Sequence, residues 1–242
     1  MNSLLIDNSN SRTKFALATD GVLQSWRGVI NTAEITEDSL SNLLQDVSYD
    51  RVTICSVVPQ KAQLIEHWMT KPTHRVSCES QLGIGISYPR PTEIGADRLA
   101  NGVAAHLHYG SPAIVIDSGT AVTFDVIEEP NLYAGGVIAP GLNLLTEYFH
   151  EKTALLPKIE LTEPTSFVGK STTEAMNIGA IAGFRGLIRE ILTGLLDELP
   201  SRPHIIATGG DAELLFRGIR RIDTVAPDLT LQGILQIDQL NH

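Results

Sequence analysis

One pattern occurs twice in this chain: a short apolar strand that ends at an aspartate, then small polar residues and a second strand. The first copy runs from Leu4 to Phe15 and the second from Ala113 to Asp125. Each copy therefore predicts a hairpin whose turn carries a carboxylate, hydroxyl groups and accessible backbone. Such a turn can bind phosphate oxygens through N–H and hydroxyl groups while its carboxylate holds a cation. An ordinary hairpin with a polar turn is the alternative interpretation of either copy alone.

The repeat continues beyond the two hairpins, because each half reads strand, strand, strand, helix, strand, helix, strand. This long-period duplication predicts two α/β halves, 1–112 and 113–242, with mixed sheets flanked by helices. Two such halves would face a ligand across a shared cleft. The elements predicted in the first half are a helix capped by Asn31 or Thr32 and reaching about Val47, a strand at 52–58, a helix at 60–69 and a strand at 73–77. Those in the second half are helices at 142–149, 171–199 and 211–218, and strands at 205–210 and 222–225.

Composition limits the class of protein. The 242 residues, of which 43% are hydrophobic, suffice for one large domain or two small α/β domains. A net charge of −10 without a basic stripe argues against a nucleic-acid partner. We expect no membrane partner and a cytoplasmic location, because the chain has no signal peptide and no apolar run near the ~20 residues of a membrane span. Cys55 and Cys78 are expected to be thiols of a reducing compartment.

The segment between the halves combines a rigid stretch with a charged helix start. Two prolines follow Tyr88 and predict extended backbone. A helix is predicted from Asp97 to Tyr109, with Asp97 in its first turn, where the helix dipole favours a carboxylate. Asp97 is either a cap or a functional group. Arg98 next to it offers a planar fork suited to a carboxylate or phosphate.

Glycine clusters mark two further places in the second half. Gly135, Gly136 and Gly141 permit close approach of the backbone to another group, or mark a bulge and a turn. The run from Thr208 to Asp211 follows an apolar strand, and its glycines let a flat group such as a purine rest on the backbone. A plain strand-to-helix turn is the alternative.

The run Gly169, Lys170, Ser171 resembles the end of a P-loop, but Pro164 occupies the place of the first required glycine, which excludes that motif. Thr172 and Thr173 are expected to cap the long helix. A substrate-binding role for Thr172 is the alternative.

In this order and spacing, the motifs resemble those of type III pantothenate kinases, within the sugar kinase, Hsp70 and actin superfamily. The resemblance covers nearly the whole chain. It implies two duplicated ribonuclease H-like (actin-like ATPase) domains and ATP-dependent phosphorylation of pantothenate on its primary hydroxyl, the first step toward coenzyme A. The motifs are Gly95 to Arg98, Asp117 to Asp125, Gly135 to Gly141, Gly169 to Thr172 and Thr208 to Gly210.

The resemblance also implies roles for individual residues. Asp97 would be the general base, Asp7 would help hold Mg²⁺, and Asp117 would bind a monovalent cation, K⁺ or NH₄⁺. The family is dimeric, with sites near the dimer interface, so Thr172 would reach pantothenate in its own subunit or in the partner. The residues implied to contact pantothenate are Tyr88, Gly95, Ala96, Asp97, Arg98 and Thr172. Those implied to contact ATP are Asp7, Asn8, Ser9, Asn10, Ser11, Arg12, Thr13, Lys14 and Thr120.

The chain departs from the family pattern at Ser9, where the first hairpin usually carries glycine. If that residue must take a positive φ, serine costs on the order of 1 kcal/mol, and its side chain would crowd the phosphates. Two other functions fit the same fold: a kinase of another small hydroxylated substrate, and a non-catalytic accessory factor in transcription.

Overall fold

The computed structural model describes residues 1–210 and 212–242, and the side chains of these except residues 143, 145, 146, 149, 150 and 213. The chain divides into two compact units, each discontinuous in sequence. These units are not the same as the two predicted halves of the repeat, 1–112 and 113–242, and the boundary between those halves stays a prediction. Unit 1 comprises Met1–Gly110, Ile127–Gly135 and Asp228–His242, and unit 2 comprises Ser111–Val126 and Gly136–Pro227.

The first sheet has five strands in the order β3-β2-β1-β4-β5. The central strand β1 pairs antiparallel with β2 and parallel with β4, and β4 pairs parallel with β5. The sheet is therefore mixed, as the sequence predicted. Its strands are β1 (Asn2–Asn8), β2 (Arg12–Thr19), β3 (Val22–Asn31), β4 (Arg51–Ser56) and β5 (Thr73–Arg75).

The second sheet repeats this arrangement. Its order is β11-β10-β7-β8-β9-β6, so β9-β8-β7-β10-β11 matches β3-β2-β1-β4-β5 strand for strand, and β6 is added beyond β9. This match confirms the predicted duplication. The strands are β6 (Gly85–Ile86), β7 (Ala113–Ser118), β8 (Ala121–Glu128), β9 (Leu132–Pro140), β10 (His204–Gly209) and β11 (Thr224–Val225).

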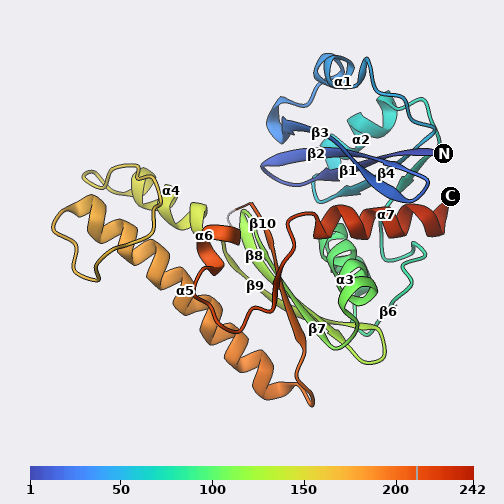
Figure 1. Cartoon of the computed structure of the whole chain (residues 1–242). Coiled ribbons are helices and arrows are strands. Elements are labelled where there is room, and N and C mark those ends of the chain that lie inside the picture. The colour runs from blue at the N-terminus through green and yellow to red at the C-terminus, as the bar shows by residue number, and fades with distance from the viewer. Residues whose placement is uncertain (211) are drawn as a thin grey trace. The chain divides into compact units, whose positions relative to one another are not determined.

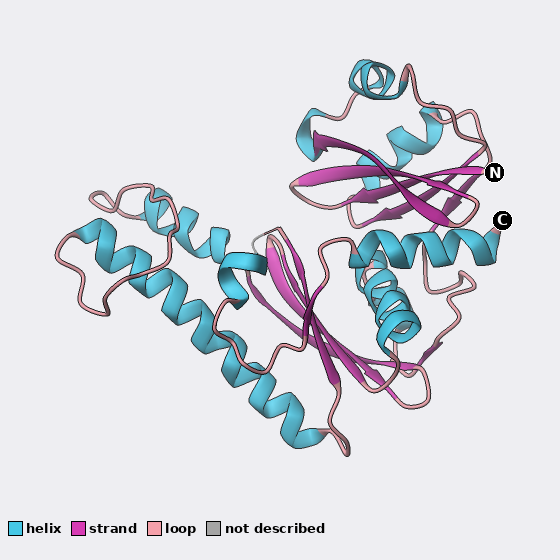
Figure 2. Ribbon diagram, viewed as in Figure 1, coloured by secondary structure: helices cyan, strands magenta, loops and turns pink. Residues whose placement is uncertain are grey.

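Helices follow the strands in a mixed α/β order (Figure 2). The longest, α5, buries residues on one stripe at a spacing of three to four, the pattern of a helix packed on one face. The helices are α1 (Glu37–Leu44), α2 (Pro59–Trp68), α3 (Ala96–Tyr109), α4 (Leu142–Lys152), α5 (Thr172–Glu198), α6 (Ala212–Phe216) and α7 (Leu229–Asn241), with 3₁₀ turns at Thr32–Glu34 and Pro91–Glu93.

Strand β1 is apolar without interruption because both faces of its sheet are covered. Leu4 and Ile6 belong to a core cluster that includes residues of α1 and α2. Leu5 belongs to a second cluster that includes residues of α3 and α7. Figure 1 shows α1 and α2 on one side of the five-stranded sheet and α7 on the other. Successive strand residues point to opposite faces, so each face receives its own part of the apolar run.

Two predicted helix starts were wrong. Asn31 ends β3, and α1 begins later with Thr36 as its cap, in a reciprocal capping box with Ser39. The long helix is capped by Ser171, whose Oγ accepts a hydrogen bond from the Glu174 N–H at 3.2 Å, and not by Thr172 or Thr173. In both places several cap-forming residues stand close together, and the one whose side chain reaches the third residue of the helix caps it.

Helix α7 was not predicted, and it closes unit 1. Gly233 packs so tightly on α3 that a Cβ there would collide with the Ala100 carbonyl oxygen. Near its other end, the fully buried Asp238 binds the sheet. Arg51 Nη2 donates to its carboxylate at 2.6 Å, Ser3 Oγ at 2.7 Å and Thr53 Oγ1 at 2.8 Å. The C-terminal helix is thus tied to both α3 and the first sheet.

Within the described part of the chain, no helix combines the length and the apolar character that crossing a bilayer requires. Cys55 and Cys78 are both in the reduced thiol form.

We predict opposite effects for two glycine-to-alanine changes. Gly233→Ala forces α7 away from α3 and should destabilise the protein by about 1–3 kcal/mol, the usual cost of overpacking. Gly194 lies in α5 with open space at its Cβ position. Gly194→Ala should therefore stabilise the folded protein by about 0.5–1 kcal/mol, because alanine favours the helix more than glycine does. Thermal unfolding of both variants measures the difference, and a Gly233→Ala midpoint at or above that of the wild type would contradict the close packing.

Candidate functional site

The first predicted hairpin forms as expected between β1 and β2. Asp7 pairs with Lys14 and Asn8 with Thr13, and the Ser9 N–H donates to the Arg12 carbonyl at 3.2 Å. The turn therefore spans Ser9 to Arg12, directly beyond the buried aspartate.

Buried polar side chains hold this turn from below. Asn8 Nδ2 donates to Thr13 Oγ1 at 2.7 Å, and Thr13 Oγ1 lies 3.0 Å from Thr32 Oγ1. Thr32 Oγ1 donates to the Ser9 carbonyl at 2.6 Å, and Ser56 Oγ donates to Asn8 Oδ1 at 2.6 Å. The side chains of Asn8 and Thr13 are thus engaged within the protein and fix the shape of the turn.

Asp7 is the buried charge of the hairpin. Its Oδ1 accepts a 2.8 Å hydrogen bond from Ser9 Oγ, and its Oδ2 lies 3.7 Å from Lys14 Nζ. Burial raises the pKa of Asp7, and the Lys14 charge and the Ser9 hydrogen bond partly offset that rise. A cation at this carboxylate would offset more of the desolvation cost.

Ser9 does not carry the predicted backbone strain. Among the described residues other than glycine, the positive φ is that of Asp20, at 49°. Ser9 therefore adopts an ordinary backbone conformation, and its hydroxyl serves as a donor to Asp7. The conditional cost of about 1 kcal/mol for a left-handed serine does not apply here.

The start of α3 places Asp97 near the first hairpin. Gly95 is the N-cap, and the Arg98 N–H donates to Asp97 Oδ1 at 2.8 Å. A Cβ on Gly95 would lie 2.6 Å from Asp97 Oδ1 and 3.4 Å from Val57 Cγ1, so glycine leaves room for the carboxylate. The Val57 N–H in turn donates to the Asn8 carbonyl at 3.1 Å. Val57 thus bonds the hairpin through its backbone and lies beside Gly95, the N-cap of α3.

One tyrosine lies beside Arg98, and a second packs against the same hydrophobic core. The guanidinium carbon of Arg98 lies 5.9 Å from the ring centroid of the fully buried Tyr133, a cation–π distance. The half-buried Tyr88 packs against the same core cluster, and a Cβ on Gly135 would lie 3.4 Å from its ring. Sequence reasoning missed Tyr133, although it directly precedes the glycine run of β9. Unit 1 therefore brings together the first hairpin, Asp97, Arg98 and Tyr88.

The second hairpin, in unit 2, is enclosed by glycines. The Gly119 N–H donates to the Ala121 carbonyl at 3.0 Å, and the Gly141 N–H donates to the Thr120 carbonyl at 3.1 Å. A side chain on Gly141 would collide with the carbonyl oxygens of Gly119 and Thr120. Asp117 is half-buried, whereas Gly119 and Thr120 are exposed. The turn thus combines a carboxylate with accessible backbone and hydroxyl groups.

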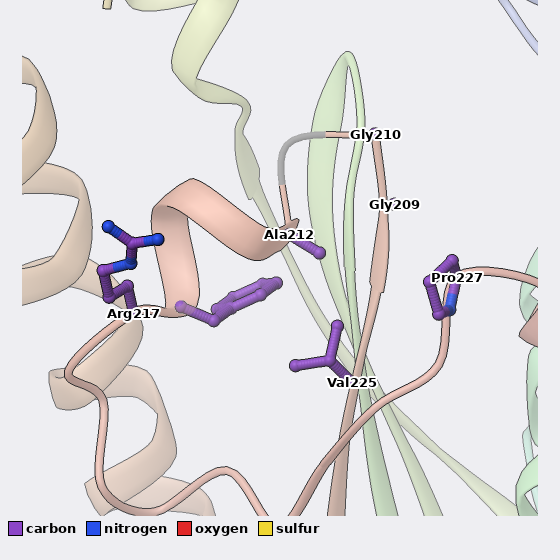
Figure 3. Close-up of a pocket in the computed structure, with 7 residues that line it drawn as sticks. Gly209, Gly210, Ala212, Arg217, Val225 and Pro227 are labelled. Carbon is purple, nitrogen blue, oxygen red and sulfur yellow. The ribbon is translucent and has the colours of Figure 1, made fainter. Parts of the chain in front are cut away.

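Strand β10 runs alongside this turn and opens a pocket. Gly209 pairs with Ser118, has a φ of 104°, and leaves no space for a side chain against the Ser118 backbone. Beyond it lies a cavity of about 530 Å³ in unit 2 (Figure 3). Asp211, part of the predicted motif and helix, lies outside the described residues. The lining residues are Gly209, Gly210, Ala212, Phe216, Arg217, Val225 and Pro227.

Thr172 is the first residue of α5 and is exposed. It follows the cap Ser171, and the Lys170 N–H before it donates to Glu174 Oε2 at 2.6 Å. The threonine hydroxyl therefore lies at a helix N-terminus whose capping is supplied by neighbours.

Comparison with known proteins places this arrangement in a family. The family model described as type III pantothenate kinase matches residues 3–194. Type III pantothenate kinases from Akkermansia muciniphila and Methylacidiphilum infernorum are 52% and 41% identical to this chain, over 97% and 98% of it and 97% and 88% of their own lengths. That of Rhodospirillum rubrum is 39% identical over 99% of this chain and 98% of its own.

Solved structures agree in fold. A Campylobacter jejuni protein described as a Baf family transcriptional activator superposes with a TM-score of 0.65 at 18% identity, covering 98% of this chain and 97% of that one. Component A of the Acidaminococcus fermentans (R)-2-hydroxyglutaryl-CoA dehydratase gives 0.52 at 13% identity, covering 97% and 95%. These likenesses support the actin-like ATPase fold alone. The family match and the relatives at 39–52% identity decide the family: the chain belongs to the type III pantothenate kinases.

Proposed function

We propose that this chain transfers the terminal phosphoryl group of ATP to the primary hydroxyl of pantothenate, giving 4'-phosphopantothenate, the first step toward coenzyme A, in the cytoplasm. The observation that carries the proposal is the position of the Asp97 carboxylate in the first turn of α3, because the start of this helix at Gly95 lies against Val57, which bonds the first hairpin. A base beside a phosphate-binding turn is what transfer to an alcohol requires.

In this mechanism Asp97 accepts the hydroxyl proton as the oxygen attacks phosphorus. The Arg98 N–H donates to Oδ1 of this carboxylate and so orients it at the start of α3. Arg98 binds the pantothenate carboxylate through its guanidinium, which Tyr133 supports from one face. Tyr88, Gly95 and Ala96 complete the substrate contacts, and Thr172 contributes its exposed hydroxyl.

The first hairpin and Thr120 bind the ATP phosphates. The exposed side chains of residues 10–12 are the candidate donors, because Asn8 and Thr13 hold the turn and Ser9 donates to Arg12 and Asp7. Lys14 offsets part of the negative charge that develops during transfer, and a metal ion held by Asp7 would supply further positive charge there. Asp7 suits Mg²⁺, which takes one or two carboxylates together with substrate phosphates and so needs no larger cluster of acidic residues.

Asp117 would hold a monovalent cation, K⁺ or NH₄⁺, beside the second hairpin. The fit rests on the donor set, because the carbonyls of Gly119 and Thr120 and the Asp117 carboxylate are oxygen ligands of the kind that hard cations prefer. Bound there, the cation supplies fixed positive charge for phosphate binding.

The pocket beside β10 would take the adenine base. Its lining by Gly209 and Gly210 allows a flat group to rest on the backbone, and Ala212, Phe216, Val225 and Pro227 add an apolar surface.

The transcriptional-regulator alternative is not favoured. Two observations could support it. One is the description of a structural neighbour at 18% identity, but that level of identity shows a shared fold only. The other is serine at position 9 in place of the usual glycine, but Ser9 does not have a positive φ. A kinase of another hydroxylated substrate is likewise not favoured, since the relatives at high coverage are named pantothenate kinases.

A coupled assay of ADP release with ATP, Mg²⁺, K⁺ and pantothenate tests the function, and release that depends on pantothenate is expected. Asp97→Asn should keep the fold and ATP binding but lose about 10²–10⁴-fold in turnover, the usual contribution of a general base. Asp46→Asn, remote from these residues in sequence and in the loop after α1, is the control and should behave as wild type. Near-normal turnover of Asp97→Asn would remove it from the base role.

Replacing K⁺ by Na⁺ should reduce turnover strongly, because a smaller cation is held less well by a site suited to K⁺ or NH₄⁺. Adding NH₄⁺ should restore the rate. Turnover of Asp117→Asn should be low and should be the same in K⁺ as in Na⁺. Equal wild-type rates in both salts would refute the cation site at Asp117.

We also propose a homodimer. Between α4 and α5 the side chains of Leu155, Phe167 and Val168 are 90%, 85% and 65% exposed, an unusual concentration of apolar surface for one segment.

Light scattering coupled to size exclusion should give twice the chain mass of 26.2 kDa. Phe167→Glu should shift this value toward that of one chain, because a charge cannot be buried without a partner. Leu107→Glu, an equivalent change at a half-exposed leucine of α3, should leave it unchanged. A wild-type mass of one chain would overturn the dimer.

A further inference from the structure

Arg185, in the middle of α5, joins two segments of unit 2. Its Nη1 and Nη2 donate to the two carboxylate oxygens of Glu163 at 2.8 and 2.7 Å. Its Nη2 also donates to the Leu214 carbonyl at 2.8 Å, and its Nε to the Leu215 carbonyl at 3.1 Å. The side chain is only 11% exposed, so these hydrogen bonds are largely shielded from water.

The two carbonyls belong to α6, a helix of five residues. The last four carbonyls of a helix lack partners within it, and a positive charge at that end is favourable. Arg185 supplies both the donors and the charge. Ala212 and Phe216 of the same short helix line the pocket. By bonding α6, Arg185 therefore holds the helix that forms one side of that pocket.

Glu163 fixes Arg185 in turn. The paired hydrogen bonds from Arg185 hold the pKa of Glu163 below its usual range, against the opposing effect of desolvation, and the charge of Arg217 lowers it further. The segment that carries Glu163 is itself fixed to α5, because Asn177 exchanges hydrogen bonds of 3.0 and 2.9 Å with the Thr162 backbone. A bidentate pair of this kind determines the plane of the guanidinium.

We propose that Arg185 is a positioning residue for the nucleotide: with Glu163 it holds α6 so that the pocket keeps the shape that receives the adenine base. The proposal rests on the proposed kinase function and on adenine as the occupant of the pocket. Because the pocket lining does not touch the reacting atoms, its loss removes binding that ground state and transition state share. The KM for ATP should then rise while kcat and the KM for pantothenate stay near their wild-type values.

Arg185→Gln tests this and should raise the KM for ATP about fivefold to tenfold, the change expected for the net loss of one typical hydrogen bond. Arg185→Lys keeps the charge without the fork and should give a smaller rise. Arg189→Gln, an exposed arginine one turn further along α5, is the control and should change neither KM. A purely structural role would instead lower kcat through a smaller active fraction at unchanged KM, and that result would overturn the proposal.

Glu163→Gln decides the question if Arg185→Gln does not fold, since it leaves the contacts of Arg185 with α6 possible. It should raise the KM for ATP about twofold to threefold, and an unchanged value would overturn the proposal. A wild-type chain without pantothenate-dependent ADP release would instead contradict the proposed function. Calorimetric titration with ADP then tests Arg185 separately, and equal affinity in wild type and Arg185→Gln would overturn its role.

Discussion

The architecture of unit 1 depends on the hydrogen bonds and the ion pair that the buried Asp238 carboxylate makes with the first sheet. Asp238 lies in α7, near the end of the chain, yet its partners Ser3, Arg51 and Thr53 lie in β1 and β4. Removing the partner of a buried charge typically costs about 3–5 kcal/mol, so this helix is held firmly on the sheet. Through the contact of Gly233 with Ala100, α7 also packs closely against the helix that carries Asp97 and Arg98.

Close backbone approach at glycine shapes the start of α3 and the second hairpin, two places where we propose ligand contacts. At Gly95 a side chain would crowd the Asp97 carboxylate, and at Gly141 and Gly209 it would collide with the backbone of the second hairpin. Turns built this way expose N–H groups and carbonyls to a ligand while the surrounding strands stay packed. The charged groups are added to this frame, so the phosphate chemistry depends on packing as much as on the acidic residues.

Much of the fold could be predicted from the local pattern. The hairpins at Asp7 and Asp117, the repeated order of strands and helices along the two halves, and the placement of Asp97 in the first turn of α3 all follow from apolar runs and turn residues. Helix caps were less certain, because Thr36 and Ser171 each had neighbours able to cap. Helix α7 escaped prediction since its buried Asp238 and tightly packed Gly233 weaken an amphipathic pattern that only its partners explain.

The sequence by itself determined the duplicated α/β plan, the two aspartate-bearing turns and the resemblance that the family match later confirmed. These depend on periodicity and on short motifs, which local physical chemistry reads directly. Only the tertiary structure decided that Asn8 and Thr13 support the turn from within and that Ser9 avoids a left-handed backbone. It also decided that Tyr133 contacts Arg98 and that Arg185 bonds the short helix α6. Such roles depend on contacts between residues that are far apart in the sequence, and the spacing of residues along the chain does not predict those contacts.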